Sequence, residues 1–195
     1  MIIGSGIWWL LSTSERSLKL KILSKFSDEI FRFLLIAFVS NVLFHLSDVL
    51  QAPYQALLLT KEPIFLAVVI TVTYNLWELL PKIVGKPALL VSVLQFIFLQ
   101  FSLNHLFYYS LYNSSKLLAL ASLNIILLIT ITFIKLQNWQ QMGLILGSAI
   151  GNLVLMNGSR VLYFGFVFTP ELLVTTTFLF IIIIFVRRKQ LSKQT

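Results

Sequence analysis

The sequence contains no cysteine, and this absence excludes several kinds of chemistry. Without a thiol, the chain forms no disulfide, provides no thiolate ligand to a metal and has no cysteine nucleophile or CxxC redox motif. Other metal ligands are sparse. His45 precedes Asp48 by three residues, but no third candidate ligand lies near this pair. Two ligands do not make a metal site, so the sequence predicts a surface pair here and no metal or other cofactor.

Charged residues are scarce as well, at 11% of the 195 residues, whereas 58% are hydrophobic. Soluble domains average about 25% charged and about 45–50% apolar residues. The mean hydropathy is +0.91, and apolar runs recur along the whole chain, so one water-facing fold cannot bury them all. The composition predicts an all-α integral membrane protein with a single transmembrane domain, residues 1–195, and no soluble catalytic domain.

Seven apolar segments, bounded by charge, proline or glycine, are candidate membrane spans. They are Met1 to Ser12, Glu29 to Asp48, Pro63 to Leu80, Pro87 to Tyr112, Leu117 to Ile134, Met142 to Met156 and Glu171 to Val186. The clearest helix start is Thr169-Pro170-Glu171, which supplies a capping hydroxyl, a preset φ and an acid. The first segment rises only about 18 Å against a hydrocarbon core of about 30 Å. We therefore expect this short helix to be re-entrant, to lie where the membrane is thinned, or to lack residues upstream of Met1.

Lysine and arginine orient the chain by the positive-inside rule. With the N-terminus outside, twelve of them fall in inner segments and only three in outer loops, namely Lys61, Lys116 and Arg160. All four tryptophans then fall at the inner interface. The sequence thus predicts an N-out, C-in, multi-pass protein of the plasma membrane. Its net charge of +8 indicates contact with anionic lipid headgroups and not with nucleic acid.

The third predicted span carries polar groups on one face. Thr71, Asn75 and Glu78 are spaced so that they share a side of the helix, with Tyr74 next to them. Glu78 lies near the inner end. It is either an interfacial carboxylate paired with Lys82, one turn on, or a buried functional acid.

The fourth predicted span is the most polar. It contains Gln95 and a stripe of Gln100, Asn104 and Tyr108 at spacing four, with His105 about 100° around the helix. These side chains form interhelical hydrogen bonds, or they line a polar cavity or a lipid-headgroup pocket. His105 would need an orienting partner to act as a general base, and the sequence shows none.

The sixth predicted span has a tandem small-xxx-small pattern. Gly143, Gly147 and Gly151 repeat at spacing four, which lets another backbone approach closely. We expect this face to pack within the monomer rather than between protomers.

Arg160 is a cation on the side where cations are rare. Its guanidinium can hold a lipid phosphate in bidentate fashion, and Tyr163 lies one turn on. We predict a phospholipid-binding pocket at the outer face formed by Arg160, Tyr163, Asn104 and His105. The alternative is that Arg160 simply extends to the interface.

Two parts of the chain resemble prolipoprotein diacylglyceryl transferase, a seven-span, N-out, C-in bacterial family that moves diacylglycerol from phosphatidylglycerol to a cysteine. The first part is Ser27-Asp28-Glu29, a long second span and Gln51-Ala52-Pro53-Tyr54. The second runs from Gly151 through Arg160 to Phe168-Thr169-Pro170-Glu171-Leu172-Leu173 and ends at Arg187-Arg188-Lys189. By this resemblance Arg160 is the family's functional arginine, and the pathway is lipoprotein biosynthesis.

The signature motifs of that family are absent. Where its His-Gly-Gly is expected, residues Thr60 to Phe65 read Thr-Lys-Glu-Pro-Ile-Phe. Its Gly-Arg-x-Gly-Asn-Phe signature is also missing, since the stretch from Pro81 to Lys135 has no arginine and only one glycine, Gly85. We therefore expect a non-catalytic relative whose partners are membrane lipids, phosphatidylglycerol among them, and another membrane protein.

Two other functions fit the sequence. A small substrate-binding subunit of a vitamin or metal importer matches the length and the polar fourth span, although such subunits usually have six spans and both termini inside. A structural or regulatory membrane subunit matches the glycine pattern and the uncharged later spans.

Overall fold

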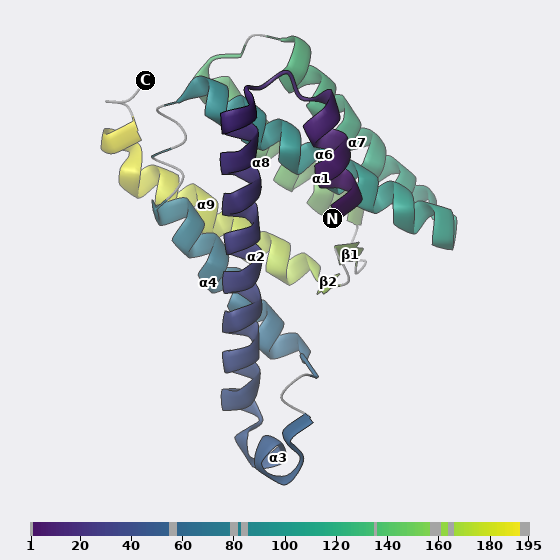
Figure 1. The fold of residues 1–195 in the computed structure, drawn as a ribbon, viewed down its shortest axis with the longest axis vertical. Helices are drawn as coiled ribbons and strands as arrows, with labels where there is room; N and C mark the ends of the chain where they lie inside the picture. The colour runs from purple at the N-terminus through teal and green to yellow at the C-terminus, as the bar shows by residue number, and fades with distance from the viewer. Residues whose placement is uncertain are drawn as a thin grey trace.

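A computed structural model describes residues 2–54, 58–78, 82, 86–134, 136–156, 161–163 and 166–191 of the chain (Figure 1). Within these residues the fold is helical apart from one short hairpin. The elements are α1 (Ile2–Leu11), α2 (Arg16–Phe44), α3 (Leu46–Gln51), α4 (Lys61–Glu78), α6 (Pro87–Tyr112), α7 (Ser115–Phe133), α8 (Asn138–Met156), β1 (Val161–Tyr163), β2 (Phe166–Phe168) and α9 (Pro170–Leu191).

The helices form a layered, elongated arrangement. In Figure 1, α2 runs along the long axis with α3 at its lower end, and α6 and α7 lie side by side as a helical hairpin. Helix α4 packs between α2 and α9, α8 contacts α7 and α9, and α1 lies on α6.

Each of the seven predicted spans overlaps a helix. The fourth has the predicted bounds, Pro87–Tyr112. At the start of α9, the backbone N–H of Leu172 donates to the Thr169 hydroxyl at 3.4 Å, which confirms the predicted cap. The bounds of the second predicted span need correction, because α2 begins at Arg16 rather than Glu29 and is interrupted at His45 before α3. The basic segment before Glu29, which lies outside the predicted span, is helical because leucine and lysine are good helix formers.

Two of the described helices, α6 and α7, are long and apolar enough to cross a membrane. Helices α8 and α9 contain shorter apolar stretches, Gln140–Met156 and Pro170–Val186. Helix α2 carries charge along its first half, and α4 has Lys61 and Glu62 at one end and Glu78 at the other. Of the seven predicted spans, the fourth and fifth therefore correspond to helices that meet the length and composition needed to cross a membrane.

The all-α prediction omitted a hairpin. Strands β1 and β2 pair antiparallel, with Val161 opposite Phe168 and Tyr163 opposite Phe166. Strand β1 also contacts α6. Aromatic and β-branched residues favour strands, so a short strand pair in this segment agrees with local propensity.

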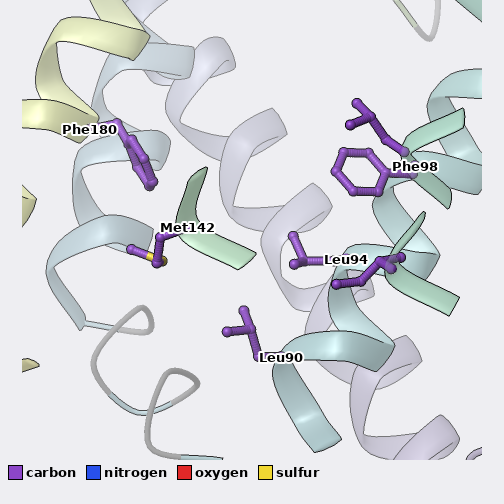
Figure 2. Packing of buried hydrophobic residues seen from close by; sticks show 7 residues of the cluster. Leu90, Leu94, Phe98, Met142 and Phe180 are labelled. Carbon is purple, nitrogen blue, oxygen red and sulfur yellow. The ribbon is translucent and has the colours of Figure 1, made fainter. Parts of the chain in front are cut away.

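The main core joins four helices through one stripe of α6. Leu90, Leu94 and Phe98 recur at spacing four, so they share a face. Figure 2 shows Met142 of α8 and Phe180 of α9 in the same cluster. A second cluster holds α1 and α2 against α6, where Phe96 contacts Trp8 and Phe26 edge-on at centroid distances of 5.1 and 4.7 Å. Both clusters fix the position of α6.

Candidate functional site

A groove of about 730 Å³ lies where the α1–α2 connection meets the first turns of α6 and the last turn of α7. Its lining includes one carboxylate, Glu15, and one ammonium, Lys21. Hydroxyl side chains make up most of the remaining polar lining. The complete lining is Thr13, Ser14, Glu15, Ser17, Leu18, Lys21, Ala88, Val91, Ser92, Gln95 and Thr132.

Hydrogen bonds hold the floor of the groove in place. The hydroxyls of Ser14 and Ser92 lie 2.7 Å apart, and the Ser92 hydroxyl donates to the Ala88 carbonyl at 2.8 Å. Because Ser92 has a single hydroxyl hydrogen, Ser14 is the donor to Ser92. On the α7 side, the Gln95 amide donates to the Thr132 hydroxyl at 3.2 Å. These bonds tie the connection, α6 and α7 together.

Contacts between α1 and α2 position the wall that carries the charges. The Lys19 ammonium donates to the Trp9 carbonyl at 2.8 Å and lies 5.7 Å from the centroid of the Trp9 ring. A cation at the last turn of α1 also offsets the negative end of that helix. Trp8 is 2% exposed in the aromatic cluster on α6. The connection between α1 and α2 is therefore held by the Lys19–Trp9 contact between these helices and by the packing of Trp8 on α6.

Four polar side chains of the groove face outward. Thr13, Glu15, Ser17 and Lys21 are exposed, and no side-chain hydrogen bond or ion pair joins them to another residue of the described chain. Their donors and acceptors are accessible to a ligand in the groove. Hydrophobicity patterns do not reveal such a site, and the hydroxyl-rich run Ser12-Thr13-Ser14 is the local sequence signal that points to it.

The predicted outer pocket is described only in part. Arg160 lies outside the described residues, and of Tyr163 only the strand position is described. Strand β1 contacts α6, the helix that carries Asn104 and His105. Asn104 is partly buried, whereas His105 is 0% exposed. His105 therefore lies in the protein interior and does not line an open surface.

Two polar residues of α6 make interhelical hydrogen bonds. Gln100 is 4% exposed and its amide donates to the Ser5 hydroxyl of α1 at 3.0 Å. A Cβ built on Gly4 would overlap the Gln100 side chain, coming within 2.9 Å of Cδ. The glycine therefore permits this close approach. Gln100 thus makes the interhelical hydrogen bond of the structural interpretation, whereas Gln95 both bonds to Thr132 of α7 and lines the groove.

The polar face of α4 divides into a buried and an exposed part. Thr71 Oγ1 and Asn75 Oδ1 are buried and have no hydrogen-bond partner within the described chain. Glu78 is partly exposed, and its carboxylate accepts a hydrogen bond from Lys82 at 3.0 Å, so the paired-carboxylate interpretation is confirmed. Tyr74 is also exposed and lies under Arg32 of α2, 4.1 Å from the guanidinium to the ring centroid.

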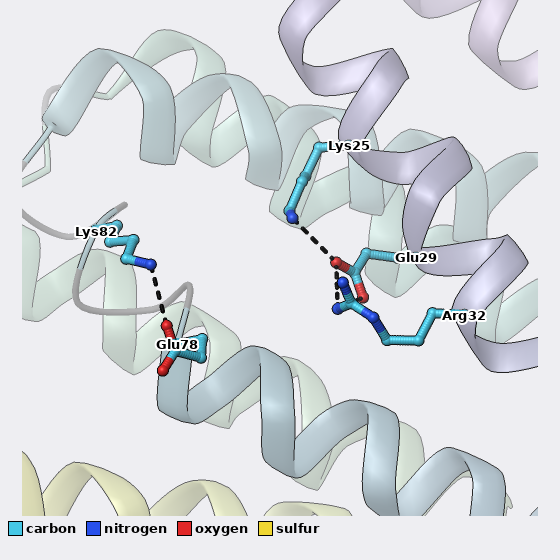
Figure 3. A network of polar contacts seen from close by, with 5 residues as sticks. All are labelled: Lys25, Glu29, Arg32, Glu78 and Lys82. Atoms are coloured by element: carbon cyan, nitrogen blue, oxygen red, sulfur yellow. Dashed lines mark hydrogen bonds and ion pairs between the residues drawn. The ribbon is translucent and has the colours of Figure 1, made fainter. Parts of the chain in front are cut away.

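Charged side chains gather where α2 faces α4, as Figure 3 shows. Arg32 donates to both carboxylate oxygens of Glu29, at 3.0 and 2.9 Å, and Lys25 lies 3.5 Å from the same group. These charges are mutually satisfied. At the C-terminal end of α2, Nδ1 of His45 lies 3.7 Å from the Asp48 carboxylate and Nε2 lies 3.0 Å from the Thr60 hydroxyl. Among the described residues no group of three or more metal-ligating side chains occurs.

Among the described residues, the glycine pattern of α8 packs against another helix at Gly151. A Cβ on Gly151 would lie 2.9 Å from Leu123 Cδ2 of α7, whereas a Cβ on Gly143 or Gly147 would meet no described atom within 4 Å. The predicted packing of the face within the monomer is thus seen at Gly151, and no described residue packs on Gly143 or Gly147. The orientation of α8 about its axis, set by Met142 and its neighbours in the core, turns these two glycines outward.

No protein-family model, curated protein or solved structure matches this chain.

Proposed function

We propose that the chain is a non-catalytic, multi-pass protein of the plasma membrane that binds lipid headgroups on a scaffold resembling prolipoprotein diacylglyceryl transferase. The main support is that each of the seven predicted spans overlaps a helix, combined with the apolar surface that these helices expose. On α2 alone, Phe31 is 69% and Leu43 70% exposed. Apolar surface of this extent requires a lipid or protein environment.

The non-catalytic assignment rests on sequence motifs. Neither the His-Gly-Gly motif nor the Gly-Arg-x-Gly-Asn-Phe signature occurs in this chain. The chain should therefore fail to restore growth to a strain depleted of prolipoprotein diacylglyceryl transferase, with expression and membrane insertion verified in the same cells. Growth on this gene alone would contradict the assignment.

At the outer face, Arg160 is the proposed lipid-phosphate ligand. It is one of only three outward cations in the predicted topology, and it directly precedes β1, which contacts α6. A charge-assisted bond to phosphate is worth about 1.5–3 kcal/mol, or about tenfold or more in affinity. Arg160→Ala should therefore release copurifying phosphatidylglycerol, Arg160→Lys should retain part of it, and Lys116→Ala should have little effect. Equal retention in all three variants would make Arg160 an interfacial anchor.

A structural or regulatory subunit is the second candidate, and the outward glycines favour it. Gly143 and Gly147 are exposed and have free space above them. Close backbone approach by a helix of another membrane protein would cover them. Gly147→Leu should then reduce recovery of that partner in a mild-detergent purification, whereas Ile145→Leu should not.

A further inference from the structure

The groove beside the α1–α2 connection lies at one end of the α6–α7 hairpin. On α6 it uses the first turns, from Ala88 to Gln95, and on α7 it uses Thr132, one residue before the last. Among the described helices, these two are long and apolar enough to cross a membrane. The end of such a hairpin lies at the depth of the lipid headgroups. The groove is at the opposite end of α6 from Asn104 and His105.

The lining carries both signs of charge. Glu15 offers a carboxylate and Lys21 an ammonium, and no ion pair joins either to another described residue. The Glu15 carboxylate would repel a purely anionic ligand, and the Lys21 ammonium would repel a purely cationic one. A ligand with an ammonium and a phosphate satisfies both, because ammonium donates to carboxylate and phosphate accepts from lysine and hydroxyls.

The apolar part of the lining distinguishes a lipid from a soluble ligand. Leu18, Ala88 and Val91 lie in the groove beside the hydroxyls. They provide contact for the glycerol and first methylenes of an acyl chain, which a soluble zwitterion lacks.

We propose that this groove binds the headgroup of a zwitterionic phospholipid with a primary ammonium, of the phosphoethanolamine type. Glu15 accepts from the ammonium, and Lys21, Thr13 and Ser17 donate to the phosphate. The Ser14–Ser92 pair holds the connection in place beneath the ligand. This inference rests on the membrane insertion that the proposed function includes, but it concerns a second site with a different lipid preference.

The test uses the full chain, delipidated in mild detergent and titrated with short-chain phosphatidylethanolamine, phosphatidylglycerol or free phosphoethanolamine. Native mass spectrometry reads the bound fraction. The wild-type chain should bind phosphatidylethanolamine about tenfold more tightly than phosphatidylglycerol, the difference expected for one charge-assisted hydrogen bond. Free phosphoethanolamine should bind more weakly than the lipid.

Charge variants separate the two contacts. Glu15→Gln should abolish the preference for phosphatidylethanolamine, and Lys21→Gln should weaken both lipids. The matched controls are Glu62→Gln and Lys61→Gln, exposed at the start of α4, away from the α1–α2 connection (Figure 1). Thr13→Trp, at an exposed position of the lining, should block both lipids without changing charge.

Three results would overturn the inference. They are equal binding of the two lipids by the wild-type chain, equal effects of the groove and control variants, and binding of free phosphoethanolamine as tight as that of the lipid. Thermal unfolding of each variant identifies a folding defect, and Thr13→Trp gives an independent reading if Glu15→Gln does not fold. Membrane insertion is tested separately by reporter fusions, so a chain that inserts without this preference leaves the proposed function standing.

Discussion

The Ser14 hydroxyl donates to the Ser92 hydroxyl across 2.7 Å and thereby fixes the α1–α2 connection to α6, 78 residues further along the chain. Ser92 is 4% exposed, and its hydroxyl donates a hydrogen bond to the Ala88 carbonyl. The bond closes the floor of the groove and positions the two charged side chains on its wall. The stability and the shape of this region therefore depend on the same contact.

Ser92→Ala should lower the free energy of unfolding in detergent by about 1 kcal/mol, because the Ser14 hydroxyl loses its acceptor. Adding Ser14→Ala should then cost little, so a double-mutant cycle should give a coupling energy clearly above zero. Ser110→Ala is the control, since this exposed hydroxyl donates within its own helix to Phe107. Additive effects of the two serine substitutions would show that the bond does not stabilise the fold.

Gly4→Ala should destabilise the chain, because the added Cβ meets the Gln100 side chain and displaces it from Ser5. Overpacking and the lost hydrogen bond together predict a loss of about 1–3 kcal/mol. Gly6→Ala adds the same methyl group two residues on, where nothing lies within 4 Å. Thermal unfolding should rank Gly6→Ala at or above the wild-type chain, and the reverse ranking would place Gln100 elsewhere.

Gly151→Leu should separate α8 from α7, because even a Cβ at this position lies 2.9 Å from Leu123. A loss of stability of about 1–3 kcal/mol is expected for overpacking of this kind. Gly147→Leu should be tolerated by the isolated chain, since its Cβ meets nothing within 4 Å. Thermal unfolding of the two variants side by side checks this, and equal destabilisation would mean that α8 packs through the whole glycine pattern.

Arg32→Lys should weaken the α2–α4 contact even though it keeps the charge. Lysine cannot match the two bonds to Glu29 together with the cation–π contact of the guanidinium with Tyr74. The expected loss is about 1 kcal/mol, since the site is partly exposed. Lys25→Gln should change the stability little, because Lys25 is 43% exposed and 3.5 Å from Glu29. A larger effect for Lys25→Gln than for Arg32→Lys in chemical unfolding would contradict this ranking.

The positions of most helices could be predicted from the sequence, because apolar runs end at prolines and charges. Pro87 and Pro170 each stand at the first residue of a helix. The start of α2 was missed because Lys19, Lys21 and Lys25 interrupt the apolar pattern without lowering helix propensity. Charge thus limits what hydropathy can predict about helix length.

The site was less predictable than the helices. Spacing places Gly143, Gly147 and Gly151 on one side of α8, but tertiary packing decides which way that side faces. The groove combines residues around positions 13–21, 88–95 and 132, and no local pattern reports that they meet. The pairing of Glu78 with Lys82 follows from their spacing of four, whereas no sequence pattern indicates that Gln100 contacts Ser5 of α1.

Reporter fusions after Gln51, Asn113 and Gln194 test the central claim of a multi-pass, N-out, C-in membrane protein most directly. The account predicts external signals from the Gln51 and Asn113 fusions and an internal signal from the Gln194 fusion, because twelve of the fifteen lysines and arginines then face inward. An external signal from the Gln194 fusion would contradict it.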